Sequence, residues 1–320
     1  MHKLVGLAVS AVVGLAAIYA FSPRALPTFA ATAAQPDRLL VNGVAQAGAR
    51  LLAVGEQGLV LASDDGGRQW APVPITPARG ATLTAVSFAD ARHGVAVGHD
   101  GWILRTSDGG AHWEEAGFTA GREPLLGVAG GSGGAPLLAV GAFGQLLRSG
   151  DQGATWTPQP LPQAEERHLN AVAVAGASRA LVAGEAGTLL RSEDGGQTWA
   201  RLPAIYPGSF FGVLALAADE WIVFGMRGHV FRTHDFGASW EAARVPLAVT
   251  LFGGTVLADG RVVLVGQGGA ILVSADRGAS FQLAKAGGRL SLASASAAHD
   301  GGLVVSGESG VRAESLQAMN

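Results

Sequence analysis

The sequence predicts an all-β protein, a seven-bladed β-propeller, and two repeated motifs are the basis of this prediction. One motif, Ser/Thr-x-Asp-x-Gly-x-(polar)-Trp/Phe, occurs six times, and its aromatic residues are 43, 43, 43, 41 and 41 positions apart. A second motif, an apolar run that ends in Gly-x-x-Gly, occurs seven times. Such a period matches one propeller blade, a sheet of four antiparallel strands. The 48 glycines among 320 residues fit a backbone with many tight turns.

The chain begins with an apolar segment that is distinct from the repeats. Lys3 precedes an uncharged run of eighteen residues, Leu4 to Phe21. This length lies between the core of a secretory signal, about 7–15 residues, and a membrane span of about 20 residues. We therefore predict that residues 1–24 are a signal peptide or an N-terminal membrane anchor. The remainder is then exported, to the periplasm in a Gram-negative host, either free or tethered to the inner membrane.

Each repeat divides into four short strands. In the second repeat we predict strands at Leu83–Ala89, Gly94–Gly98, Trp102–Thr106 and His112–Ala116, which are apolar or β-branched runs separated by Gly/Asp turns. The apolar runs do not alternate with polar residues, which is expected when neighbouring blades cover both faces of a sheet.

The first motif, which we call the Asp box, is predicted to form the turn between the third and fourth strands. Its Asp can accept hydrogen bonds from the following backbone N–H groups, and its Gly can adopt a positive φ. Its aromatic ring is predicted to be buried between adjacent blades. We therefore assign a structural role, rather than metal binding or catalysis, to the six box aspartates: Asp65, Asp108, Asp151, Asp194, Asp235 and Asp276.

The seventh repeat ends before any Asp box, so its sheet needs a fourth strand from elsewhere. Its predicted strands lie near Arg289–Ser296, Gly302–Gly307 and Gly310–Leu316. Because an unpaired edge strand is a liability, we predict that residues 25–31 pair with the last of these strands. The propeller then occupies residues 25–320.

Two sets of polar residues are candidates for binding a partner. Four arginines lie eight positions before a box aromatic on consecutive blades: Arg105, Arg148, Arg191 and Arg232. This arginine arc either binds an acidic or C-terminal carboxylate segment of a partner, or bonds neighbouring carbonyls and box carboxylates in a structural role. The second set lies in the Gly-x-x-Gly turns, which form either a binding face or a solvated rim: His99, Asp100, Glu185 and Arg227.

A further charged run, Glu165-Glu166-Arg167-His168, lies in the connection after the third box. A charge run in a loop is either a solvated surface or part of a binding site. Both interpretations stay open from the sequence.

Composition and spacing argue against several function classes. The net charge of −3 gives no basic patch for nucleic acid. Cysteine is absent and the histidines have no metal-ligand spacing, so we expect no metal and no cofactor. Each box aromatic precedes the next Gly-x-x-Gly motif by 26 or 28 residues, so no blade carries an inserted loop for an active site. We therefore expect no enzymatic activity.

The alternative is a carbohydrate-binding propeller or a glycosidase with paired carboxylates. The candidate carboxylates for that chemistry lie in the Gly-x-x-Gly turns: Glu56, Asp100, Glu185 and Glu308.

Segments such as Ala139–Ser149 and Leu181–Trp199 resemble the photosystem II stability/assembly factor family of propellers with bacterial neuraminidase repeats. The resemblance extends from about Arg38 to the C-terminus. It implies an exported, non-enzymatic and monomeric propeller that helps to assemble a membrane protein complex. Photosynthetic members bind a reaction-centre subunit through an arginine patch, to which only the arginine arc corresponds here. In a non-photosynthetic host, the resemblance implies an accessory factor of an envelope complex such as an RND-type exporter.

Overall fold

The computed structural model describes residues 2–21, 39–117, 119, 121–130 and 135–316, in two units, Met1–Ala33 and Ala34–Asn320. The first unit contains one helix, α1 (His2–Phe21), with exposed apolar side chains such as Val12 and Leu15. Among the described residues, no helix combines the length and hydropathy that a membrane crossing requires. The assignment of residues 1–24 as a signal peptide or an anchor stays a prediction.

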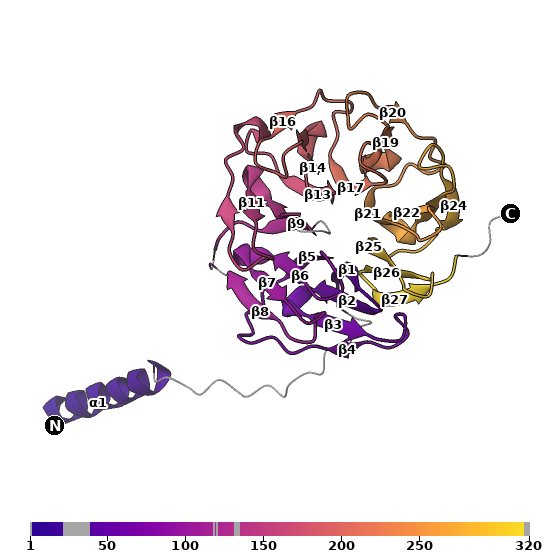
Figure 1. Cartoon of the computed structure of the whole chain (residues 1–320). Coiled ribbons are helices and arrows are strands. Elements are labelled where there is room, and N and C mark those ends of the chain that lie inside the picture. The colour runs from indigo at the N-terminus through magenta and orange to yellow at the C-terminus, as the bar shows by residue number, and fades with distance from the viewer. Residues whose placement is uncertain (1, 22–38, 118, 120, 131–134, 317–320) are drawn as a thin grey trace. The chain divides into compact units, whose positions relative to one another are not determined.

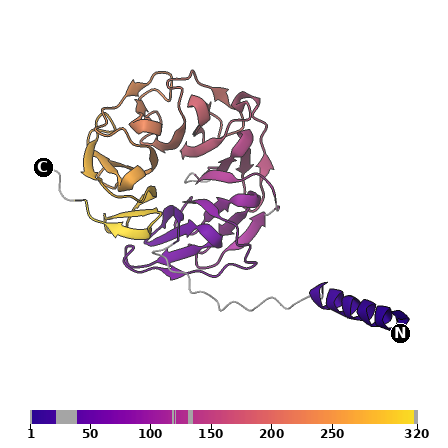
Figure 2. The same cartoon turned by 180° about the vertical axis from the view of Figure 1, so that it is seen from behind.

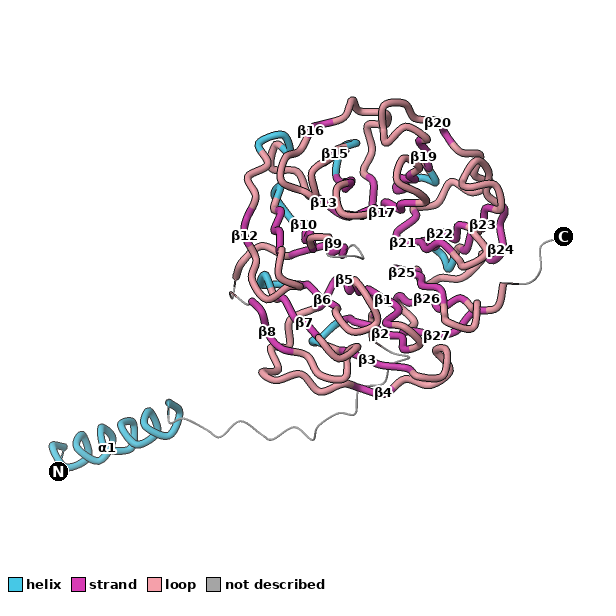
Figure 3. Tube along the Cα trace, in the orientation of Figure 1, coloured by secondary structure: helices cyan, strands magenta, loops and turns pink. Residues whose placement is uncertain are grey.

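The second unit is a ring of seven antiparallel sheets, each of which is one blade. Figure 1 and Figure 2 show the ring from its two sides, with the first strand of each blade nearest the axis. In Figure 3 the described residues of this unit are strands and loops with a few short helical turns. The predicted all-β, seven-bladed propeller is therefore confirmed.

Within each blade the strands follow one another from the axis to the rim. Blades one to three contain β1 (Val41–Ala47), β2 (Arg50–Gly55), β3 (Val60–Ser63) and β4 (Ala71–Pro72); β5 (Leu83–Phe88), β6 (Gly94–Gly98), β7 (Ile103–Thr106) and β8 (Glu114–Gly117); β9 (Leu125–Gly130), β10 (Leu137–Gly141), β11 (Leu146–Ser149) and β12 (Thr157–Pro158). Blades four to six contain β13 (Leu169–Ala175), β14 (Arg179–Gly184), β15 (Leu189–Ser192) and β16 (Ala200–Arg201); β17 (Phe210–Ala215), β18 (Trp221–Gly225), β19 (Val230–Thr233) and β20 (Glu241–Ala242); β21 (Leu251–Val256), β22 (Val262–Gly266), β23 (Ile271–Ser274) and β24 (Gln282–Lys285). Blade seven contains β25 (Leu292–Ala297), β26 (Leu303–Gly307) and β27 (Gly310–Glu314).

Short 3-10 turns join the second and third strands of blades one to six. They are η1 (Glu56–Gly58), η2 (His99–Gly101), η3 (Ala142–Gly144), η5 (Glu185–Gly187), η6 (Met226–Gly228) and η7 (Gln267–Gly269). One more such turn, η4 (Pro162–Ala164), lies in the connection from blade three to blade four.

Several predicted strands are longer than the observed ones, for local reasons. The predicted strand Trp102–Thr106 loses its first residue, because the N–H of that residue bonds the His99 carbonyl and ends the preceding turn. The predicted strand His112–Ala116 loses its first two residues, because the N–H of the first is held by Asp108 in the box. The predicted strand Arg289–Ser296 begins three residues later than expected.

Blade seven has three strands among the described residues, and β27 is the outermost of them. The predicted strands Gly302–Gly307 and Gly310–Leu316 correspond to β26 and β27, with one or two residues fewer. The segment 25–31, which was predicted to supply the fourth strand, lies outside the described residues. Side chains nevertheless join the two ends of the ring, since Leu51 of blade one packs in a buried cluster with Val304 of blade seven.

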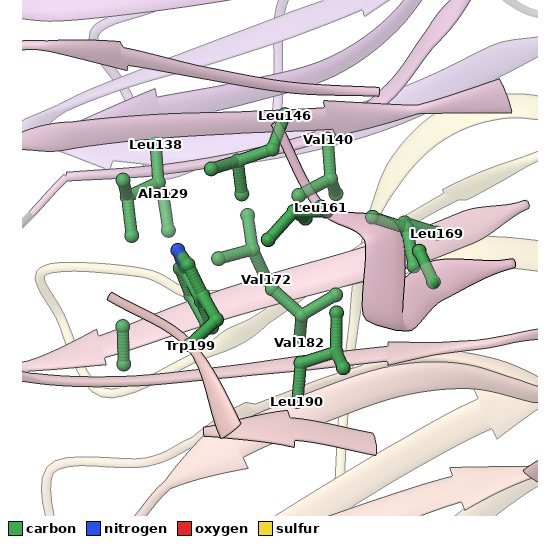
Figure 4. Close-up of a cluster of buried hydrophobic side chains, with 12 residues drawn as sticks. Ala129, Leu138, Val140, Leu146, Leu161, Leu169, Val172, Val182, Leu190 and Trp199 are labelled. Atoms are coloured by element: carbon green, nitrogen blue, oxygen red, sulfur yellow. The ribbon is translucent and has the colours of Figure 1, made fainter. Parts of the chain in front are cut away.

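The hydrophobic core lies between neighbouring blades. The second strands are its centre, and all five residues of β10 are buried. Figure 4 shows the cluster between blades three and four, where Leu138 and Val140 of β10 meet Val172, Val182 and Trp199 of the next blade. This box tryptophan, Trp199, is 8% exposed, which confirms for this box the predicted burial between blades. Burial of apolar side chains between neighbouring blades therefore stabilises the ring.

Candidate functional site

The six Asp boxes form equivalent turns on one face of the ring, which we call the box face. In each box the Ser or Thr hydroxyl donates to the aspartate Oδ1 and accepts the N–H of the box glycine, at 2.7–3.0 Å. In the third box the hydroxyl of Thr155 also donates to Oδ2 of Asp151, at 2.6 Å. These hydrogen bonds, that of the Thr155 hydroxyl first, lower the pKa of Asp151 to about 2. The turn itself thus engages both carboxylate oxygens, which supports the structural role assigned to the box aspartates.

Two members of the arginine arc connect one blade to the next. Arg148 Nε donates to the Gly195 carbonyl at 2.9 Å, and Arg191 Nη1 donates to the Phe236 carbonyl at 3.2 Å. Both carbonyls belong to the box turn of the following blade. The Arg191 guanidinium also lies 5.5 Å from the centre of the Phe236 ring, within the range of a cation–π contact. These two side chains act as fastenings between blades.

The other two members of the arc form ion pairs within their own blade. Arg105 pairs with Glu114 at 2.8 Å, and Arg232 pairs with Glu241 at 2.8 Å. Each glutamate lies on the fourth strand, and its side chain is more than half exposed. Two arginines of the arc, Arg148 and Arg191, therefore bond to the next blade, and the other two form ion pairs within their own blade that solvent can reach.

The opposite face carries the Gly-x-x-Gly turns and the connections between blades, and we call it the turn face. Three turn carboxylates accept backbone N–H groups of a neighbouring connection: Asp100 from Gly121 at 2.7 Å, Glu185 from His168 at 2.9 Å, and Glu308 from Ser291 at 2.6 Å. These bonds fix the path of the chain from one blade to the next. They also leave these carboxylates partly engaged, which disfavours paired acid and base catalysis by them.

The structure separates the two predicted sets of binding residues. The arginine arc lies toward the box face, whereas His99, Asp100, Glu185 and Arg227 lie in the turns at the other end of the third strands. A single binding surface therefore cannot include both sets in full. Within the described residues, the side chains of His99 and Arg227 have no hydrogen bond or ion pair.

A cavity at the axis of the ring, which we call the central channel, was not predicted from the sequence. Residues of the first strands of all seven blades line a cavity of 210 Å³. Each first strand has an irregularity in register at its second residue, and these residues line the channel: Asn42, Thr84, Leu126, Asn170, Phe211, Phe252 and Ala293.

The channel wall differs from one side to the other. Asn42 and Asn170 each donate to a carbonyl at the start of the next blade's first strand, at 2.8 Å. On another side, the rings of Phe211 and Phe252 are 5.5 Å apart. The sequence could have indicated these channel residues only by their position, because each of them follows the buried apolar residue that begins a first strand. A one-residue register shift leaves no other mark on the sequence.

A second cavity of 420 Å³ lies where the channel meets the turn face, beside blades one, two and seven. It brings together two residues singled out from the sequence, Glu56 and His99, with the hydroxyl side chains Thr82 and Thr84. Glu56 occupies the same turn position as Glu185, but its carboxylate has no hydrogen bond to a described residue. This cavity therefore contains one unengaged carboxylate, which suits binding of a polar group.

The described residues contain no group of three or more His, Asp or Glu side chains that could hold a metal ion.

Comparison with known proteins agrees with this geometry. Residues 136–257 match the family model described as Photosynthesis system II assembly factor YCF48. No curated protein matches the chain in sequence.

Solved propellers resemble the chain in fold. YCF48 from Cyanidioschyzon merolae is similar with a TM-score of 0.70 and 16% identity, over 87% of this chain and 96% of that one. A structure described as YCF48 bound to D1 peptide gives 0.68 and 16%, over 91% and 100%. The WD40 propeller domain of Doa1 gives 0.70 and 15%, over 88% and 94%. At these identities the likeness to solved structures concerns the fold alone.

Proposed function

We propose that this chain belongs to the YCF48-like photosystem II assembly factor family of Asp-box propellers and is a non-enzymatic scaffold that binds a segment of a membrane protein. The similar structure of YCF48 holds a D1 peptide, and binding of a peptide segment is the activity that we carry over to this chain. In a non-photosynthetic host, the proposed partner is an envelope complex such as an RND-type exporter. Residues 1–24 would direct the propeller to the periplasm or tether it to the inner membrane.

The observation that carries this proposal is a difference between the two faces in how many polar side chains are already hydrogen-bonded. On the box face, carboxylates and arginines bond to their own turns and to neighbouring blades. On the turn face, Glu56, His99 and Arg227 have side chains without hydrogen bonds to described residues, and a cavity lies beside Glu56 and His99. Preformed cavities with a few polar groups are typical of binding sites.

Affinity purification tests the proposal. We would tag the C-terminus of the full chain, cross-link cells, solubilise membranes and identify co-purified proteins by mass spectrometry. We expect one membrane complex in stoichiometric amount, which the same tag on an unrelated exported protein does not retain. Recovery of the propeller alone would overturn the proposal.

The arginine arc is tested best at Arg105 and Arg232, the two members whose recorded contacts are ion pairs within their own blade. Arg105→Glu and Arg232→Glu remove only ion pairs within a blade, so the ring should stay folded. Loss of the co-purified complex in this double variant would identify the arc as the docking site. Unchanged recovery would assign docking to the turn face.

A carbohydrate ligand is the second candidate, and the cavity at the channel mouth is the observation that favours it. Glu56, Asn42, Thr82 and Thr84 line this cavity, and such groups can bond sugar hydroxyls. Because Glu56 is the single carboxylate among the described residues that line it, the cavity suits sugar binding better than hydrolysis. A glycan array with wild type and Glu56→Gln tests this candidate, which requires a signal that the variant loses.

A further inference from the structure

The turn of blade three carries an exposed aromatic ring that folding alone does not explain. Phe143 is 55% exposed and has a φ of 53°. This left-handed conformation disfavours residues other than glycine, asparagine and aspartate. The same position in the other 3-10 turns is polar or small: Gln57, Asp100, Ala186, Arg227 and Gly268. Neither burial nor backbone preference therefore accounts for phenylalanine at this position.

A cavity of 560 Å³ lies beside this ring on the turn face. Phe143, Pro160, Leu161 and Pro162 form its apolar lining. Leu161 is 8% exposed and belongs to the core between blades three and four, where Figure 4 shows it next to Val140. The apolar base of the cavity is thus fixed to the rigid core.

Two glutamates from the charged run line the same cavity, and their partners differ. Glu165 forms ion pairs with Arg167, at 2.9 Å, and with Arg201. Glu166 is exposed and its carboxylate has no hydrogen bond or ion pair with any described residue. The cavity therefore combines apolar walls with one free negative charge.

Contacts between the turn and the connection hold the walls together. Gly144 donates its N–H to the Arg167 carbonyl at 2.8 Å. The Phe143 ring packs edge-to-face on His168, with ring centres 4.9 Å apart. A cavity that is organised before binding loses little conformational entropy when it is occupied.

We infer that this cavity, the Phe143 cavity, docks an apolar side chain of an extended peptide segment of the partner, and that a neighbouring Lys or Arg of the segment pairs with Glu166. Charge complementarity supports this choice, because Glu165 is paired with Arg167 and Arg201 whereas the Glu166 carboxylate has no partner among the described residues. The inference rests on the proposed scaffold function and identifies the chemistry of the bound segment. It places docking on the turn face, away from the arginine arc.

A defined peptide tests the inference directly. The probe is a fluorescein-labelled decapeptide of alternating leucine and arginine, and binding to the full chain is measured by fluorescence anisotropy. We expect Phe143→Ala to weaken binding about tenfold, as truncation of an aromatic anchor does. This variant should fold, because blade four has alanine at the same turn position. Leu290→Ala removes another exposed apolar side chain outside the cavity and should leave binding unchanged.

The charge is tested by a matched pair of variants. Glu166→Arg and Glu123→Arg change the net charge equally, but Glu123 lies in the connection before blade three, outside the cavity. We expect Glu166→Arg alone to weaken binding of the leucine–arginine peptide, by about fivefold or more, and to improve binding of a second labelled decapeptide of alternating leucine and glutamate. Equal effects of the two variants, undiminished binding by Phe143→Ala, or no binding by wild type would overturn the inference.

Co-purification separates this inference from the proposed function. If wild type retains the membrane complex and Phe143→Ala retains as much, the cavity is not the docking site and the scaffold function stands. If wild type retains no complex, the scaffold function fails, whatever the peptide measurement gives.

Discussion

Replacing Arg148 by alanine tests whether the arginine arc fastens the blades together. The change removes the hydrogen bond from Nε to the Gly195 carbonyl, 2.9 Å long, and leaves this carbonyl of a buried glycine without that donor. Hydrogen bonds that involve a charged group contribute about 1.5–3 kcal/mol. Because the arginine is only half-buried, we expect a loss of about 1–2 kcal/mol in the free energy of unfolding.

Arg105→Ala is the matched control, since it removes the same charge from the same position one blade earlier. Its ion pair with Glu114 is exposed, and such pairs contribute about 0–1 kcal/mol. In thermal unfolding followed by circular dichroism, we expect Arg148→Ala to lower the midpoint by about 2–4 °C and Arg105→Ala by less than about 2 °C. Arg148→Lys should resemble alanine, because lysine keeps the charge but lacks the Nε–H donor. Equal midpoints for Arg148→Ala and wild type would refute the fastening role.

Three more predictions concern the turns. The folded-state pKa of Asp151, about 2, lies below its usual value of 3.8, so the stability that its hydrogen bonds give is present above about pH 4 and is lost as the pH falls towards 2. Thermal midpoints between pH 5 and 2.5 should fall for wild type and change less in Asp151→Asn. Gly187→Ala should lose about 2–4 kcal/mol in urea unfolding, because the added Cβ would lie 1.9 Å from the Tyr206 carbonyl oxygen. Gly260→Ala, which shares the positive φ but meets no atom within 4 Å, should lose only about 1 kcal/mol. Glu166→Gly should gain about 0.5–1 kcal/mol, since its φ of 58° suits glycine, and a loss of stability there would contradict this account of the turn.

The sequence predicts the blades well because the features that define them are local. The hydroxyl, carboxylate and glycine of each Asp box lie within five residues, and each box repeats the same hydrogen bonds. The period of the repeat then determines the number of blades. The predicted strand bounds are wrong where the first N–H of an apolar run bonds within the preceding turn, as the Trp102 N–H bonds the His99 carbonyl.

The candidate site is less predictable, because it depends on contacts between residues distant in sequence. Glu56 and Glu185 occupy the same turn position, yet only the second bonds the N–H of the neighbouring connection. Arg148 and Arg105 likewise share a position, and only the first donates to the next blade in the hydrogen bonds described here. The motif fixes where the backbone lies, whereas the neighbouring blade decides what each side chain meets.

The two faces of the ring therefore differ in how many polar groups remain available. The box face joins the third strand to the fourth at the rim, so its short turns must satisfy their own carboxylates and N–H groups. The turn face also receives the connections between blades, which differ in sequence, and these leave Glu56 and Glu166 without hydrogen bonds to described residues. A carboxylate without a hydrogen bond in the protein can exchange its water for a bond to a partner, whereas a box aspartate would first have to give up the bonds of its own turn. If the arginine arc were nevertheless the docking site, a partner would have to displace Glu114 and Glu241 from Arg105 and Arg232. Glu114→Gln would then free Arg105 for the partner and strengthen binding, so an increase in affinity in that variant would identify the box face as the one that binds.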